Sequence, residues 1–409
     1  MGGLSMEWKE VTLGDFMQCN PKRTIKKGQK ARKITMDLLI PHSKTIRNWN
    51  YEPYSGGAKF QNGDTIMARI TPCLENGKHA FVSILDEGEI AYGSTEYFVF
   101  CGKEKVSDND FVYYLTKTPL FRDTAIKSMV GSSGRQRAQM DVLENLKMFV
   151  PKDISDQRRI ASILSSLDRK IDLNNKINAD LEEMAQAIFK NWFVDFEPFK
   201  DGKFVDSELG MIPEGWKVGR LDEIADVVGG STPSKAKPEY YTQKGIAWLT
   251  PKDLSNHPAV YTSRGEIDIT EEGYNSTSTK LMPKGTILFT SRAPIGYISI
   301  AQNDICTNQG FKSLVPRKAG TCFLYCFLKY VTPEIENKST GSTFKEASGA
   351  LMKSLQVIMP EQKVFEEFEE IVSPLFARIE SLEKENSRLS LLRDTLLPRL
   401  MSGELEVPE

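Results

Sequence analysis

The sequence contains few of the residues that build catalytic centres. Its 409 residues include only three histidines and six scattered cysteines. It has no Cys-x-x-Cys motif and no mixed Cys/His cluster, so we expect neither a zinc site nor a disulfide framework. No Walker-type phosphate loop, paired-carboxylate site or Ser/His/Asp arrangement stands out. These absences argue against an enzyme.

Long apolar stretches are also missing. The closest is Cys322-Phe-Leu-Tyr-Cys-Phe-Leu328, which ends at Lys329 and is shorter than the roughly 18 residues expected of a membrane span. The N-terminus has neither the basic region nor the apolar core of a signal peptide. We therefore expect a cytoplasmic protein without membrane contact.

The formal net charge is only −2, but the charges are unevenly distributed. Residues 1–152 contain 22 Lys and Arg against 17 Asp and Glu, and residues 213–360 contain 17 against 14. Residues 153–212 contain 8 against 12, and residues 361–409 contain 6 against 12. Two basic segments therefore alternate with two acidic ones, and the basic segments are the ones suited to meet phosphate.

The basic segments also repeat one plan. Trp8-Lys-Glu-Val-Thr-Leu13 opens the first copy and Leu146-Lys-Met-Phe-Val-Pro151 closes it. Trp216-Lys-Val-Gly-Arg-Leu221 and Leu355-Gln-Val-Ile-Met-Pro360 do the same in the second copy, 208 to 209 positions later. A period of roughly 200 residues indicates a duplicated domain, because solenoid repeats are far shorter. We call the copies the first module and the second module.

A long helical pattern follows each module. Apolar residues recur there at 3-4 spacing, which is typical of a coiled-coil seam. Asn174, Asn178 and Asn386 interrupt the seams and favour one fixed alignment, and Pro398 is expected to end the second helix. The alternative is two independent amphipathic helices lying on separate domains.

Within the modules, short β-type runs alternate with helical stretches. Strands are expected over residues 81–85, 97–100, 286–290 and 297–301, and helices over 111–120 and 321–330. Two loops rich in Gly and Ser, residues 130–137 and 339–345, offer hydrogen-bond donors for phosphate and base edges. A further loop, residues 21–33, contains seven cations, although a solvated charge run explains it equally well.

The order of these motifs resembles the specificity subunit of Type I restriction–modification systems over essentially the whole chain. The resemblance rests on short motifs in a duplicated plan, namely Gly229-Gly-Ser-Thr-Pro-Ser234, Ile246-Ala-Trp-Leu249, Leu281-Met-Pro-Lys-Gly-Thr-Ile-Leu288, Ser291-Arg-Ala-Pro-Ile-Gly296, Asn308-Gln-Gly-Phe311, Gln157-Arg-Arg-Ile-Ala-Ser-Ile-Leu164, Leu167-Asp-Arg-Lys-Ile171, Ala187-Ile-Phe-Lys-Asn-Trp-Phe-Val-Asp-Phe196 and Leu400-Met-Ser-Gly-Glu-Leu405. The first module departs from the pattern, with Ala68-Arg-Ile-Thr-Pro72 in place of Ser-Arg-Ala-Pro.

The resemblance implies an α+β fold with two similar target-recognition domains, separated by two long antiparallel coiled-coil helices and related by a pseudo-two-fold axis. The expected division is a first recognition domain (1–152), a central helix (153–198), a connector (199–212), a second recognition domain (213–360) and a C-terminal helix (361–409). Each domain is expected to recognise one half of a split, asymmetric DNA sequence.

The resemblance also implies partners. Two methyltransferase subunits and ATP-driven restriction/translocase subunits would join the chain on double-stranded DNA. S-adenosylmethionine, ATP and Mg²⁺ would be bound by those partners, and this chain would be non-catalytic with no cofactor or metal of its own. The alternatives are a recognition subunit of another type of bifunctional restriction–methylation enzyme, a chain with its own methyltransferase or nuclease activity, or a coiled-coil assembly scaffold.

Arg69 and Arg292 follow similar Thr-Ile strands and are expected at matching places, each contacting DNA or forming a structural salt bridge. The complete set expected to contact DNA is Arg69, Arg135, Arg137, Lys252, Arg292, Gln309, Ser342, Thr343 and Lys345. Four apolar residues near the end of the first helix are expected to be exposed and to contact either a methyltransferase or the modules, namely Ile188, Phe189, Trp192 and Phe193.

Overall fold

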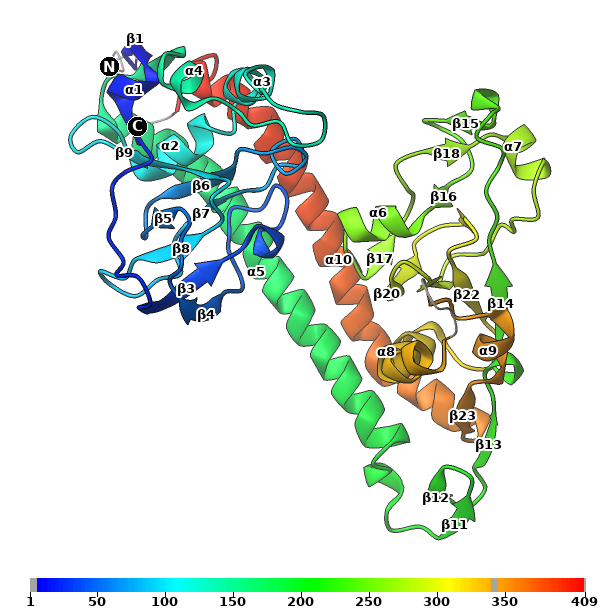
Figure 1. Ribbon diagram of the computed structural model, residues 1–409. Helices are drawn as coiled ribbons and strands as arrows, with labels where there is room; N and C mark the ends of the chain where they lie inside the picture. Colours follow the sequence, from blue (N-terminus) through cyan, green and yellow to red (C-terminus); the bar gives the residue numbers. More distant parts are fainter. Residues whose placement is uncertain (1–5, 340–344, 408–409) are drawn as a thin grey trace, which may run out of the picture. The chain divides into compact units, whose positions relative to one another are not determined.

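The computed structural model describes residues 6–339 and 345–407. The chain divides into two compact units, the first formed by Met1–Leu173 and Asn386–Glu409 and the second by Asn174–Glu385. Two long helices, α5 (Ile154–Phe193) and α10 (Gln362–Met401), each contribute one part to each unit (Figure 1).

The first unit contains two four-stranded sheets. One has the order β2-β9-β6-β7 and is antiparallel throughout, and the other has the mixed order β4-β3-β8-β5. A separate antiparallel pair, β1 with β10, joins the opening and closing segments of the module and sets Trp8 opposite Pro151. The strands are β1 (Trp8–Thr12), β2 (Met17–Cys19), β3 (Lys30–Ile34), β4 (Asn50–Pro53), β5 (Lys59–Phe60), β6 (Thr65–Ala68), β7 (His79–Phe81), β8 (Ala91–Gly93), β9 (Tyr97–Gly102) and β10 (Lys147–Pro151).

The second unit contains a five-stranded sheet of order β14-β22-β19-β20-β17. The pair β13 with β23 repeats the joining of opening and closing segments and sets Lys217 opposite Met359. Three further two-stranded pairs are β11 with β12, β15 with β18, and β16 with β21. The strands are β11 (Phe204–Ser207), β12 (Gly210–Pro213), β13 (Lys217–Arg220), β14 (Ala225–Gly229), β15 (Tyr241–Thr242), β16 (Trp248–Leu249), β17 (Tyr261–Thr262), β18 (Asp268–Ile269), β19 (Ile287–Ser291), β20 (Ile295–Ala301), β21 (Cys306–Thr307), β22 (Lys312–Pro316) and β23 (Gln356–Met359).

Short helices pack beside the sheets of both units. They are α1 (Leu13–Phe16), α2 (Asn109–Leu115), α3 (Pro119–Lys127) and α4 (Met140–Glu144) in the first unit, and α6 (Pro251–Asn256), α7 (Glu271–Asn275), α8 (Thr321–Lys338) and α9 (Gly349–Ser354) in the second. Single 3-10 turns lie at Met36–Leu38, Glu197–Phe199, Leu221–Glu223 and Pro238–Tyr240.

Three sequence expectations about these elements were wrong. The strand expected over residues 81–85 is β7, which ends at Phe81. The helix expected over 111–120 is divided in two, because Thr118 caps a new helix that begins at Pro119. The second long helix continues past Pro398 to Met401.

The long helices are antiparallel within each unit. In the first unit, Asp168 of α5 lies 2.7 Å from Arg393 of α10, and Leu164 shares a core with Leu397. In the second unit, the Asn174 amide donates to Glu385 at 2.9 Å, and the Phe189 and Phe368 rings lie 6.2 Å apart. Residue numbers rise along α5 as they fall along α10, so the expected antiparallel pairing of the two helices is confirmed.

Polar residues occupy part of this helix seam. Asp168, Asn174, Asn178 and Arg393 are all buried. Asp168 accepts hydrogen bonds from Arg393 at 2.7 Å and from the Tyr114 hydroxyl at 2.6 Å. Buried charges that are paired and hydrogen-bonded specify alignment better than apolar side chains do, because any shifted register leaves them without a partner.

Candidate nucleic-acid interface

The backbone brings three segments of the first module together at Arg69. This residue directly follows β6, and its N–H donates to the Glu96 carbonyl at 2.9 Å. The Arg69 carbonyl in turn accepts from the Ala138 N–H at 2.8 Å. The end of β6, the start of β9 and the end of the Gly-Ser loop therefore meet at one edge of the antiparallel sheet. We call this place the first strand-end site.

One carboxylate organises the side chains at this site. Arg137 donates to both oxygens of Glu96 at 2.7 to 3.0 Å, and Arg69 Nε lies 3.5 Å from the same carboxylate. These hydrogen bonds from Arg137 lower the pKa of Glu96, which therefore stays ionised. The Arg69 guanidinium also lies 5.2 Å from the centroid of the Phe98 ring. Both arginines are thus held in place while remaining partly exposed.

Arg135 lies in the same loop but differs from Arg137. Its carbonyl accepts a hydrogen bond from Arg137 at 3.1 Å, and its own side chain is exposed. No ion pair joins Arg135 to a carboxylate within residues 6–339 and 345–407. Of the two loop cations, Arg135 is therefore the one whose charge faces solvent.

The second module has the same backbone arrangement at Ser291. The Ser291 N–H donates to the Gly310 carbonyl at 2.8 Å, and its carbonyl accepts from the Ala347 N–H at 2.9 Å. Earlier in the strand, Gly63 donates to Val82 at 2.8 Å and Gly285 donates to Ala301 at 2.9 Å. Gly285 follows Gly63 by 222 residues, and Ser291 follows Arg69 by the same number. Arg69 therefore matches Ser291.

The expected match of Arg69 with Arg292 is therefore wrong by one residue. The reason is the strand register, since an ungapped alignment from Gly63 and Gly285 places Arg292 opposite Ile70. Arg292 lies in the bend that follows β19, one position after Ser291.

We call the matching place at Ser291 the second strand-end site. A cleft of about 650 Å³, lined in part by Arg292 and Gly310, adjoins it. Three of its lining residues are cations and two are aromatic, and none is acidic. The lining consists of Lys235, Tyr241, Trp248, Thr250, Pro251, Lys252, Ile267, Arg292, Ala293, Asn308 and Gly310. Cationic donors beside flat apolar rings are the combination that suits a phosphodiester with its sugar and base.

The cations of the cleft have only distant acidic partners. Arg292 lies 3.6 Å from Glu346, and Lys252 lies 3.8 Å from Glu266. Lys312, at the start of β22, also approaches Glu346 at 3.5 Å. These partly exposed pairs are worth little in water, so an anion could replace the carboxylates at small cost.

Two other expected contact residues of the second module are also exposed. Gln309 is exposed and accepts a hydrogen bond from the Thr232 hydroxyl. Lys345 is exposed and donates to the Glu336 carbonyl at 3.2 Å. Ser342 and Thr343 lie outside the described residues.

Sequence reasoning missed several members of these sites. No sequence motif marks Glu96 or Glu346, because the cations that pair with them lie more than 25 residues away in the chain. Lys235 and Trp248 fall in or directly after the motifs Gly229-Gly-Ser-Thr-Pro-Ser234 and Ile246-Ala-Trp-Leu249, which were the available signal. The strands that bring these motifs together could not be paired from the sequence.

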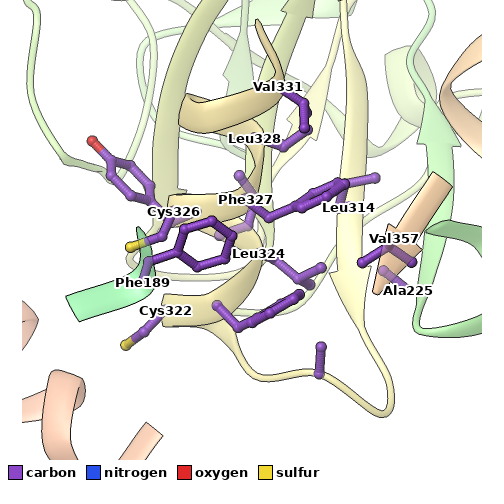
Figure 2. Packing of buried hydrophobic residues seen from close by; sticks show 14 of the residues in the cluster. Phe189, Ala225, Leu314, Cys322, Leu324, Cys326, Phe327, Leu328, Val331 and Val357 are labelled. Carbon is purple, nitrogen blue, oxygen red and sulfur yellow. The ribbon is translucent and has the colours of Figure 1, made fainter. Parts of the chain in front are cut away.

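The apolar residues at the end of α5 correct another expectation. Phe189 and Phe193 are 2% and 4% exposed, so they are not exposed, and of the two expected roles the packing on a module applies to them. They belong to the core shared by α5, α8 and α10, and the centroid of the Phe193 ring lies 4.9 Å from that of Phe323 and 5.1 Å from that of Phe368. Figure 2 shows Phe189 beside Cys322 and Cys326 of α8. Ile188 and Trp192 are half-buried against the same core. These aromatics pack on the second module because α5 alone cannot cover them.

The described residues also include side chains of the types that bind metals or act as nucleophiles. No group of three or more His, Cys, Asp or Glu side chains there is arranged to hold a metal ion. Burial raises the pKa of Cys101 and of Cys306 to about 11, so these thiols remain protonated and poorly nucleophilic. No helix among residues 6–339 and 345–407 is long and apolar enough to span a membrane.

The duplicated modules with cationic strand-end sites define a class of protein that recognises an extended anionic partner through two similar surfaces. The family model of the Type I restriction modification DNA specificity domain matches residues 6–183 and again residues 213–391. The chain therefore belongs to this family of non-catalytic subunits, which recognise the DNA sequence for Type I restriction–modification systems.

Two curated relatives support this assignment. The Type I restriction enzyme MjaIX specificity subunit of Methanocaldococcus jannaschii is 40% identical over 190 residues, which is 46% of this chain and 44% of that protein. The chain thus spans less than half of this relative. The Type I restriction enzyme HindI specificity subunit of Haemophilus influenzae is 26% identical over 469 residues, covering 98% of this chain and 100% of that protein.

A solved structure shares the fold. The crystal structure of the Type-I restriction-modification system S subunit from M. genitalium matches with a TM-score of 0.53 and 17% sequence identity, covering 99% of this chain and 97% of that one. An α+β fold with two similar domains and two long antiparallel helices was the sequence expectation, and it is confirmed.

Proposed function

We propose that this chain recognises a split, asymmetric DNA sequence within a Type I restriction–modification complex. Each module would contact one half of the target from its strand-end site, and the two helices would set the distance between the halves. The observation that supports this proposal is the repetition of one backbone arrangement at Arg69 and Ser291, with cations beside it in both modules.

The proposed division of labour follows the sequence. Residues 1–152 and 213–360 are the two recognition domains, residues 153–198 and 361–409 are the helices, and residues 199–212 connect them. The DNA contacts we propose are Arg69, Arg135, Arg137, Lys252, Arg292, Gln309, Ser342, Thr343 and Lys345. Lys235 joins this set because it lines the same cleft as Arg292 and Lys252.

The partners proposed are two methyltransferase subunits and restriction/translocase subunits, which would hold S-adenosylmethionine, ATP and Mg²⁺. Their contacts on this chain would be exposed apolar residues of the long helices rather than Phe189 or Phe193. Leu391 is 70% exposed on α10, and exposed apolar residues also include Leu173, Met184, Ile371 and Leu392. Exposed leucines on an acidic helix are suited to a protein partner.

Methyl transfer provides the test of this proposal. The full chain, a methyltransferase subunit from the same system, and both together are incubated with DNA and labelled S-adenosylmethionine. We expect transfer only when both proteins are present. Transfer by the chain alone would indicate an enzyme. A chain that neither binds DNA nor confers methylation in any combination would indicate an assembly scaffold.

A further inference from the structure

The first unit has a second group of cations in the turn before β3 and at the start of β3. Lys26, Lys27 and Lys30 are exposed there, and exposed aromatic residues lie on the neighbouring segment, with Trp49 42% exposed and Tyr51 63% exposed. We call these five residues the β3–β4 surface. Figure 1 shows β3 and β4 as neighbours, and β4 is the edge strand of its sheet.

Backbone pairing holds these residues together. The Gly28 N–H donates to the Tyr54 carbonyl at 2.9 Å, which ties the turn to the strand beside it. In the antiparallel register, Lys30 lies opposite Pro53 and Arg32 lies opposite Tyr51. Directly opposed residues project to the same face of a sheet. Lys30, Arg32 and Tyr51 therefore share one face.

The charges of this segment fall into two groups. Arg23, Arg32 and Lys33 pair with Asp64, Asp86 and Glu52 at 2.8, 3.0 and 2.8 Å. In the described part of the chain, no ion pair or hydrogen bond engages the ammonium groups of the three exposed lysines. Carboxylates thus neutralise Arg23, Arg32 and Lys33, whereas the ammonium groups of the three exposed lysines face solvent.

Trp49 and Tyr51 add hydrogen-bond donors to this surface. The Arg32 guanidinium lies 4.7 Å from the centroid of the Trp49 ring, which fixes this ring beside the cations. Neither the Trp49 indole nor the Tyr51 hydroxyl is hydrogen-bonded to the described residues. Lysine, tyrosine and tryptophan side chains are all donors for phosphate oxygens.

We propose that the β3–β4 surface binds the sugar–phosphate backbone of double-stranded DNA without regard to base sequence. This proposal rests on the proposed function, to which it adds a contact separate from the strand-end site at Arg69. The occupant is a polyanion because the surface offers three unpaired cations and aromatic donors. The surface would supply affinity that depends on salt, whereas the strand-end sites supply sequence preference.

The test compares two charge-matched variants of the full chain. The first combines Lys26→Gln, Lys27→Gln and Lys30→Gln. The control combines Lys105→Gln, Lys284→Gln and Lys318→Gln, three exposed lysines located beyond the strand ends remote from Arg69 and Arg292. Binding to a mixed-sequence duplex and to a duplex with the target sequence is measured from 50 to 200 mM salt.

We expect the first variant to reduce the slope of log K against log salt by about two to three, since each lost phosphate contact contributes about 0.9. Its ratio of target to mixed-sequence affinity should match that of the unaltered chain. The control should keep the slope. Equal slopes for the two variants would overturn the proposal, and so would a changed target ratio. If the unaltered chain binds neither duplex, the proposed function itself fails.

Lysine acetylation, followed by mass spectrometry, supplies a second measurement that needs no substitution. DNA should slow the modification of Lys26, Lys27 and Lys30 by several-fold and leave Lys105, Lys284 and Lys318 unchanged. Equal modification of the two groups with and without DNA would contradict the proposal even if the variants fold poorly.

Discussion

Arg69 of the first module and Ser291 of the second occupy the same position at the end of equivalent strands. Each donates its N–H to a carbonyl one or two residues before the neighbouring strand. Each carbonyl accepts from an N–H one or two residues after the Gly-Ser loop. The backbone hydrogen bonds are therefore repeated, while the side chain is arginine in one module and serine in the other. A duplicated frame with different side chains allows the modules to recognise different half-sites, which an asymmetric target requires.

The cation next to this position, Arg292, should determine one half-site. Arg292→Ala should cost about 1–3 kcal/mol of binding if the guanidinium contacts a base, and it should relax only the half-site of the second module. Binding selection on randomised duplexes measures both effects. Lys284→Ala, at the other end of β19, is the control. Weaker binding with every base preference retained would identify Arg292 as a phosphate contact or a structural residue instead.

Glu96 restrains the cations of the first strand-end site. Glu96→Gln removes a charge that pairs with Arg137 at 2.7 Å and lies 3.5 Å from Arg69. We expect binding to mixed-sequence DNA to strengthen and the salt slope to become steeper by about one to two. Discrimination at the first half-site should fall, because the arginines lose their fixed orientation. Glu104→Gln, an exposed carboxylate beyond the far end of β9, should leave both quantities unchanged.

These sites show what the sequence could and could not provide. The duplication, the two heptad helices and strands such as β9, β19 and β20 followed from local patterns of apolar residues. The one-residue offset between Arg69 and Arg292 did not, because register depends on hydrogen bonds between strands distant in sequence. Glu96 and Glu346 were missed for the same reason. The burial of Phe189 and Phe193 depends on α8, which a helical pattern in α5 does not reveal.

The buried pair Asp168–Arg393 should be a main determinant of helix alignment. Removing one partner leaves an uncompensated buried charge, so Arg393→Leu should lower the free energy of unfolding of the first unit by about 3–5 kcal/mol. Arg388→Leu, at an exposed position of the same helix, is the control. Thermal unfolding monitored by circular dichroism checks the difference. An equal change in Tm for both variants would show that the pair does not stabilise the seam.

Phe189 provides a second test of packing. Phe189→Ala removes a ring buried between α5, α8 and α10, and it should cost about 3–5 kcal/mol of stability. Met184→Ala, an exposed position on the same helix, should cost less than about 0.5 kcal/mol. Denaturant unfolding measures both. A stable Phe189→Ala variant that fails only to bind partner subunits would restore the original expectation of a partner contact.

Glu383 should make stability depend on pH. Its carboxylate accepts the Val260 and Tyr261 N–H groups at 2.8 and 3.0 Å, yet burial raises its pKa from 4.5 to about 7. The Glu383 carboxyl group therefore binds a proton more tightly in the folded state than in the unfolded state. Stability should therefore fall as the pH rises from 4.5 to 7, by up to about 1.4 kcal/mol per pH unit.

The Glu383→Gln variant should lose this component of the pH dependence, while one of the two backbone N–H groups loses its acceptor because the Gln amide nitrogen only donates. Glu370→Gln, an exposed carboxylate on the same helix, is the matched control and should retain the dependence. Urea unfolding at several pH values measures the slopes. An unaltered slope in the Glu383 variant would mean that another group is responsible.

Recognition of two different half-sites by the two modules of one chain can be measured by binding selection. A randomised duplex library is bound to the full chain assembled with its partner subunits, and the recovered sequences are determined. The account predicts two unlike specified segments, separated by a spacer of fixed length and unspecified sequence, with substitutions at Arg69 and Arg292 each affecting only one segment. A single continuous or palindromic sequence, or substitutions that relax both segments together, would contradict it.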